Sequence, residues 1–129
     1  MPITNQDMER GLATARQVLG RDFQVPFPRP KEAEEAWMRL ALGALFGEVW
    51  SRPPLDVRTR ALLTFATMAA MGFHQELELY IHGLRHLGFS REEISEMIIH
   101  VGMYAGIPRA VDGLAIARRA FDQEDAQAS

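Results

Sequence analysis

Apolar residues recur every three to four positions along almost the whole chain, which is the periodicity of α-helices. The pattern predicts six helices, at about residues 5–19, 31–49, 56–71, 74–87, from just after Ser90 to near Tyr104, and 109–122. Glycine or proline separates each predicted helix from the next. The sequence therefore predicts an all-α fold.

Residues at the predicted helix ends support these boundaries. Thr4 or Asn5 can cap the first helix, and Gly20 can end it. Ser90 and Glu93 fit the capping-box pattern, in which the hydroxyl accepts the third amide and the carboxylate reaches back to the cap. The pattern fixes where the fifth helix begins.

The length of 129 residues fits one domain with its own core. Residues 1–30 are expected to form an N-terminal helix and a Pro-rich arm, in which 25–30 (VPFPRP) is an extended linker. Residues 31–122 form the expected core and 123–129 a frayed polar tail. The third helix is apolar all round from Ala61 onward, which is typical of a bundle centre or a subunit interface. This pattern favours a homo-oligomer.

Composition excludes several classes of function. A net charge of -3 and a pI near 5.8 give no basic face for nucleic acid or an anionic membrane. No run of eighteen uncharged apolar residues and no signal-peptide pattern occurs, so a cytoplasmic protein is expected. The chain has no cysteine, which excludes disulfides, thiol nucleophiles and dithiol redox chemistry. Four histidines without a paired-ligand motif predict no metal site.

The segment GEVWSRPPLDVRTR (Gly47–Arg60) concentrates charge between two apolar helices. It holds Arg52, Arg58 and Arg60 around a Pro-Pro break, with Trp50 beside them. Guanidinium groups match carboxylates, and the start of the next helix adds positive potential, so an anion pocket is predicted here. The alternative is that Glu48 and Asp56 pair with these arginines in a purely structural role.

The fourth and fifth helices carry further candidates. Glu76 and Tyr80 are four residues apart and share one face of the fourth helix, whereas His82 lies on another. His100 and Tyr104 are likewise four apart on the fifth helix. Histidine suits proton transfer near neutral pH, but a histidine in so apolar a run is also typical of a hydrogen-bonded core residue. Both readings of His100 stay open.

Five sequence blocks together resemble one known family. They are G-E-V-W-x-R-P, D-x-x-T-R-x-L-L, E-L-x-x-(H/Y)-x-x-G, E-E-I-x-E and H-V-x-x-Y-x-G-x-P, and over about residues 34–121 they resemble the carboxymuconolactone decarboxylase family. The resemblance implies an alkylhydroperoxidase D-like bundle in an intertwined trimer or hexamer. It also implies decarboxylation of 4-carboxymuconolactone in protocatechuate degradation, without metal or organic cofactor.

The peroxidase branch of that fold carries C-x-x-C-x-x-x-H, and the matching positions here are Phe73, Glu76 and Tyr80. The peroxidase branch also has a glutamate before this motif, and the matching position here is Ala61. Thiol peroxidase chemistry by that route is therefore excluded.

The resemblance and the residue chemistry together suggest roles in decarboxylation. Arg52, Arg58 and Arg60 would bind the substrate's carboxylates, with Arg52 and Arg58 the favoured pair. Trp50 would form an apolar wall. The proton would come from His100, His82, or Glu48 if burial raises its pKa. Tyr80 or Tyr104 would donate to the developing oxyanion, and Glu76 would line the substrate site.

One position departs from the family pattern. Relatives of the decarboxylase type commonly carry histidine where this chain has Tyr80, and His82 points about 200° away on a helix. Two other functions therefore stay open: an isomerase or dehydratase that needs only proton transfer, and a non-catalytic helical oligomer that binds a small acid.

Overall fold

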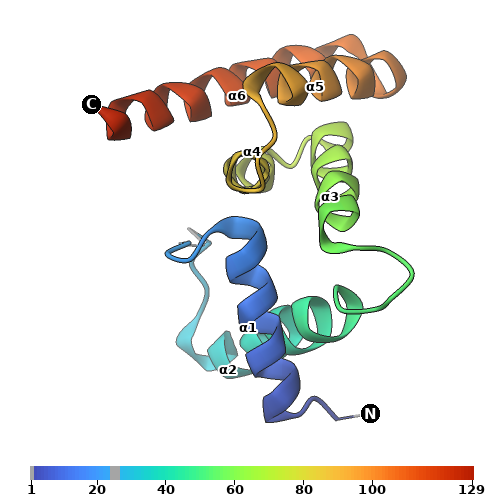
Figure 1. Ribbon diagram of the computed structural model, residues 1–129, viewed down its shortest axis with the longest axis vertical. Coiled ribbons are helices and arrows are strands. Elements are labelled where there is room, and N and C mark those ends of the chain that lie inside the picture. Colours follow the sequence, from blue (N-terminus) through green and yellow to red (C-terminus); the bar gives the residue numbers. More distant parts are fainter. Residues whose placement is uncertain (1, 24–26) are drawn as a thin grey trace. The chain divides into compact units, whose positions relative to one another are not determined.

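The computed structural model describes residues 2–23 and 27–129, and all the regular structure in these ranges is helical (Figure 1). Six α-helices occur there, which confirms the predicted fold class. The chain divides into two compact units, residues 1–60 and 61–129, and each is described by itself. The expected linker falls partly on residues 25 and 26, which lie outside the described residues.

Helix α1 (Asn5–Leu19) begins and ends as predicted. Thr4 Oγ1 accepts the Asp7 backbone N–H at 3.1 Å, and the Asp7 carboxylate accepts the Thr4 N–H at 2.9 Å. These bonds to Thr4 lower the pKa of Asp7. Gly20 ends the helix with φ 101°, a conformation that glycine adopts without a Cβ clash.

The predicted second helix covers the right residues but is not one α-helix. It comprises a 3₁₀-turn η1 (Lys31–Ala33), a short α2 (Glu34–Met38) and an eleven-residue π-helix η2 (Arg39–Val49). In its last turn the hydrogen bond still joins residues five apart, as in a π-helix, since the Trp50 N–H donates to the Leu45 carbonyl at 3.0 Å. Leu40 and Leu45 of this segment are half-exposed.

Glycines let α1 cross η2 at very short range. A Cβ on Gly11 would overlap the Leu42 carbonyl, and one on Gly47 would overlap the Asp7 carbonyl. Across the same crossing, Arg10 Nε donates to the Gly47 carbonyl at 2.7 Å. The end of η2 is thus held against α1 by backbone contact as well as by side chains.

The second unit contains most of α3 (Val57–Met71), which begins in the first unit, together with α4 (His74–His86), α5 (Arg91–Ala105) and α6 (Ile107–Ala128). In the ribbon α5 and α6 lie side by side (Figure 1). Each fully buried Leu or Ile side chain in this unit contributes about 1.5–3 kcal/mol. They are Leu77, Ile81, Leu84, Ile94 and Ile98.

The prediction of a sixth helix at 109–122 with a frayed tail is wrong, because α6 continues to Ala128. Two acids beyond the predicted end explain the difference. Glu124 pairs with Arg85 on α4 at 2.6 Å, and Asp125 pairs with Arg91 on α5 at 2.7 Å. Polar composition indicated a solvated tail, whereas tertiary ion pairs order it.

Several large apolar side chains remain exposed in the second unit. On α5 these include Ile99 and Met103, and on α6 a row at spacings of four and three, Ile107, Val111 and Leu114. Among the described residues no helix is both long enough and apolar enough to cross a membrane.

Candidate functional site

The segment between η2 and α3 is fixed at both ends by short-range hydrogen bonds. Ser51 Oγ donates to the Gly47 carbonyl at 2.7 Å, which satisfies a carbonyl in the last turn of η2. At the other end Asp56 Oδ1 accepts the Thr59 N–H at 2.7 Å and caps α3. The bonds to Thr59, with a smaller contribution from the Arg58 charge, lower the pKa of Asp56.

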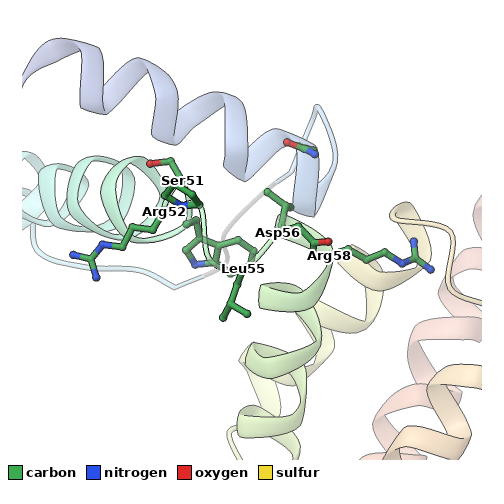
Figure 2. Close-up of a pocket in the computed structure, with 9 residues that line it drawn as sticks. Ser51, Arg52, Leu55, Asp56 and Arg58 are labelled. Atoms are coloured by element: carbon green, nitrogen blue, oxygen red, sulfur yellow. The ribbon is translucent and has the colours of Figure 1, made fainter.

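This segment borders an open cavity of about 530 Å³, which lies wholly within the first unit (Figure 2). Apart from one residue of α1, the described residues that line it come from the stretch 50–58. The lining residues are Gln17, Trp50, Ser51, Arg52, Pro53, Leu55, Asp56, Val57 and Arg58. The sequence placed an anion pocket in this stretch, and the structure has a cavity there.

The three arginines of the segment have different surroundings. Arg52 is half-exposed and donates to Glu48 Oε1 at 3.0 Å, an i,i+4 pair. Arg60 does not line the cavity; it donates to the Leu55 and Arg52 carbonyls at 3.2 and 3.1 Å and so braces the loop. Arg58 lines the cavity from the first turn of α3.

The two cavity arginines extend in opposite directions from the loop (Figure 2). As arranged, Arg52 and Arg58 do not form a single fork around one carboxylate. Both side chains are long and exposed, so reorientation of either toward the cavity costs mainly side-chain entropy, up to about 2 kcal/mol.

Trp50 supplies an apolar wall. Its side chain is buried, with 5% exposed, and its ring centroid lies 5.0 Å from that of Phe46 at an interplanar angle of 39°. A tilted aromatic pair at this distance is favourable. The indole is therefore held in place beside the charged loop.

Glu48 is not buried, although its predicted role as the proton donor required burial. Its side chain is 52% exposed and accepts hydrogen bonds from Arg52 Nε and Nη2 at 3.2 and 3.0 Å. The burial that this role required is therefore absent. Its observed contact is an ion pair.

The three candidates on α4 lie in the second unit. Tyr80 is buried, and burial raises the pKa of its phenol to about 12. The phenol therefore keeps its proton at neutral pH and can donate a hydrogen bond. His82 is half-buried, with Nε2 3.2 Å from Gln123 Oε1 on α6, and Glu76 is half-buried.

The two candidates on α5 form an exposed pair. The rings of His100 and Tyr104 lie 5.5 Å apart at 45°, as residues four apart on one helical face should. Tyr104 is 86% exposed, and His100 is exposed as well. Within one chain His100 is therefore not the core residue that its apolar neighbours suggested.

The cavity thus brings together Trp50, Arg52 and Arg58 of the predicted site residues. Sequence reasoning missed Gln17, because only the crossing of α1 over η2 brings this helix to the loop. It also left Ser51 and Leu55 unassigned, although both lie inside the charged segment. In the described ranges, no group of three or more His, Asp or Glu side chains could hold a metal ion.

The chain is a small helical protein without cysteine, in which two arginines and a buried tryptophan border a cavity. The sequence pattern of one family matches residues 32–119. The chain belongs to the carboxymuconolactone decarboxylase family.

Two relatives have named activities. The chain is 37% identical to 4-carboxymuconolactone decarboxylase of Acinetobacter baylyi over 117 residues, which is 90% of this chain and 87% of the relative. It is 28% identical to nitrosuccinic acid decarboxylase of Metarhizium robertsii over 134 aligned positions, 92% of this chain and 87% of the relative. Both relatives are decarboxylases, which supports decarboxylation as the reaction class.

Proposed function

We propose that this protein is a cofactor-independent decarboxylase of a small carboxylated lactone, with 4-carboxymuconolactone as the first candidate substrate. The observation that carries the proposal is the 37% identity to a decarboxylase of that compound across 90% of the chain. The cavity beside Arg52, Arg58 and Trp50 supports it, because its charge and wall suit a compact carboxylated ring.

The reaction sets three requirements for the protein. The carbon–carbon bond to the departing carboxylate breaks, carbon dioxide leaves, and the electron pair moves into a dienolate that ends on the lactone oxygen. A proton then adds to a ring carbon. The site must therefore hold carboxylates, stabilise negative charge on the lactone oxygen and supply a proton.

The arginines have different roles in binding the substrate's carboxylates. Arg58, at the start of α3, is the principal carboxylate ligand, because the helix N-terminus adds positive potential there. Arg52 binds a second carboxylate of the substrate, which replaces Glu48 as its ion-pair partner. Arg60 keeps the loop in shape through the carbonyls that it contacts, and Trp50 excludes water.

Residues of the second unit complete the proposal. His100 or His82 delivers the proton, since histidine is the side chain that most often acts as a general acid. Tyr80 or Tyr104 donates to the lactone oxygen, and Glu76 lines the substrate site. The raised pKa of Tyr80 suits a donor that keeps its proton throughout turnover.

The test is decarboxylation of 4-carboxymuconolactone by the purified chain, followed as loss of carbon dioxide in the product mass. Arg58→Ala should lower kcat/KM by about 100-fold or more, the scale on which loss of a charged contact acts. Arg21→Ala removes an exposed arginine that does not line the cavity and should leave kcat/KM unchanged. Equal rates for the two variants would refute the role of Arg58.

The product also separates the candidate functions. A product of unchanged mass would indicate an isomerase, and loss of water a dehydratase. Nitrosuccinate belongs in the same assay, because the likeness to nitrosuccinic acid decarboxylase supports a nitro-substituted acid as the alternative substrate. No conversion of either compound would overturn the proposed decarboxylase.

The partner proposed for this chain is a second copy of itself, in a homotrimer or homohexamer. The exposed rows on α5 and α6 support this, because large apolar side chains at helical spacing are typical of interfaces. Sedimentation equilibrium tests it, and a monomer at micromolar concentration would contradict it.

A further inference from the structure

Gln17 lines the cavity from α1, whereas the other lining residues in the described part of the chain belong to the stretch 50–58. It also lies outside residues 32–119, the part that matches the family. Because the pattern common to the family does not include this position, members of the family can differ in the side chain that they carry here.

The Gln17 carboxamide is available to a ligand. Its side chain is exposed, and among the described residues it makes no hydrogen bond, ion pair or ring contact. The other polar groups of the lining are largely engaged: Ser51 donates to Gly47, Asp56 caps α3, and Arg52 pairs with Glu48. The amide offers two donors and an acceptor without charge, so it suits a neutral oxygen.

The helix that carries Gln17 is held against η2, which leads into the loop. Gly11 lies in close contact with η2, and Arg10 donates to the Gly47 carbonyl, which also accepts from Ser51. Arg10 of α1 and Ser51 of the loop thus donate to the same carbonyl. This bracing fixes the spacing between α1 and residues 50–58, as a substrate-binding residue requires.

We propose that Gln17 is a specificity-determining residue, whose amide N–H donates to the lactone carbonyl oxygen while arginine holds the carboxylates. The inference rests on the proposed function and names the group that recognises the ring. Substrates with a ring carbonyl are favoured over plain dicarboxylates, which offer nothing for a neutral donor. Because negative charge develops on that oxygen, the bond strengthens during decarboxylation.

Binding of two acids, measured by calorimetry, tests the inference. The probes are 4-carboxymuconolactone and succinate, which has carboxylates but no ring carbonyl. Gln17→Leu should raise the Kd for the lactone by about 3- to 10-fold, the range for one neutral hydrogen bond, and leave the Kd for succinate unchanged. If the protein decarboxylates the lactone, Gln17→Leu should lower kcat/KM by a larger factor than it raises the Kd.

A matched control is available on the same helix. Gln6 is also an exposed glutamine of α1, but it does not line the cavity. Gln6→Leu should leave both Kd values unchanged. Gln17→Glu should weaken the binding of both acids through repulsion between like charges, and added salt should reduce this effect. Gln6→Glu should not weaken the binding of either acid.

The outcomes separate this inference from the proposed function. The inference would be overturned if Gln17→Leu raised the Kd of both acids equally, or if it changed neither Kd. If the chain binds the lactone in a Gln17-dependent way but releases no carbon dioxide, the inference stands and the decarboxylase proposal fails. If the wild-type chain binds neither acid, both fail.

Discussion

The ion-pair cluster at the end of α6 gives a prediction that needs no substrate. Glu124 accepts from Arg85 Nη2 at 2.6 Å and Nε at 3.0 Å, and lies 3.4 Å from Arg91. The Arg85 hydrogen bond, with further contributions from both arginine charges, lowers the pKa of Glu124 to about 2. Glu124→Gln keeps the shape of the side chain and removes its charge.

The expected cost lies between two limits. A hydrogen bond to a charged group contributes about 1.5–3 kcal/mol, and an exposed ion pair about 0.2–1 kcal/mol. The Glu124 side chain is one-third exposed and contacts two arginines. We therefore expect Glu124→Gln to lower the free energy of unfolding by about 1–2 kcal/mol, which corresponds to a Tm lower by about 4–8 °C.

The pH dependence follows from the lowered pKa. A carboxyl group whose pKa is lower in the folded state stabilises fully above its unfolded pKa, ordinarily 4.5, and loses this contribution as pH falls toward about 2. The difference between wild type and Glu124→Gln should therefore be largest at neutral pH. At about pH 3 it should shrink to less than roughly half.

The assay is urea unfolding followed by helical circular dichroism at fixed protein concentration, at neutral pH and at about pH 3. Asp122→Asn is the matched control, since Asp122 pairs with Arg118 at 3.2 Å while both side chains are mostly exposed. It should cost less than about 0.5 kcal/mol. If Glu124→Gln costs no more than Asp122→Asn, or the same at both pH values, the ion pairs do not stabilise the end of α6.

Three further predictions concern the packing, the buried phenol and the exposed apolar face. Gly11→Ala should lower stability by about 1–3 kcal/mol in thermal melts, because the methyl would overlap backbone. Gly113→Ala should cost less, because its methyl would meet a side-chain methyl of Ile98 at 2.8 Å and no backbone. Tyr104→Phe leaves Tyr80 as the one tyrosine of the sequence, and its phenolate absorbance should appear only near pH 12. Because the unfolded chain would lose this proton near pH 10, the free energy of unfolding should fall as pH rises from 10 toward 12. Ionisation of Tyr80 at pH 10 would contradict its burial. Val111→Glu should lower the sedimenting mass of the proposed oligomer, and an unchanged mass would place the interface elsewhere.

The fold was predictable wherever local signals suffice. The Thr4 and Ser90 capping boxes and the glycine after α1 depend on neighbouring residues only, and all are present. The π-helix at Arg39–Val49 was not predictable, because its apolar pattern fits an ordinary helix as well. The ordered end of α6 depends on Arg85 and Arg91, which lie more than thirty residues away in the sequence.

The candidate site was predictable to a similar extent. Charge and proline content identified the segment that borders the cavity, and Trp50 is buried there. The sequence could not tell Arg60, which braces the loop, from Arg58, which lines the cavity, because both precede the apolar part of α3. It gave no sign of Gln17, whose place depends on the crossing of two helices.

The two acids of the loop act differently on its arginines. Asp56 uses one carboxylate oxygen to cap α3, so its position is set by the helix and changes little when an anion binds. The Glu48 carboxylate pairs with Arg52 in an exposed i,i+4 ion pair of the kind that contributes about 0.3–0.5 kcal/mol. A substrate carboxylate that also gains from the cavity wall can displace so weak a partner. The structural pairing of Arg52 is therefore compatible with substrate binding, and full pairing of an arginine in the free chain is no argument against a role in the site.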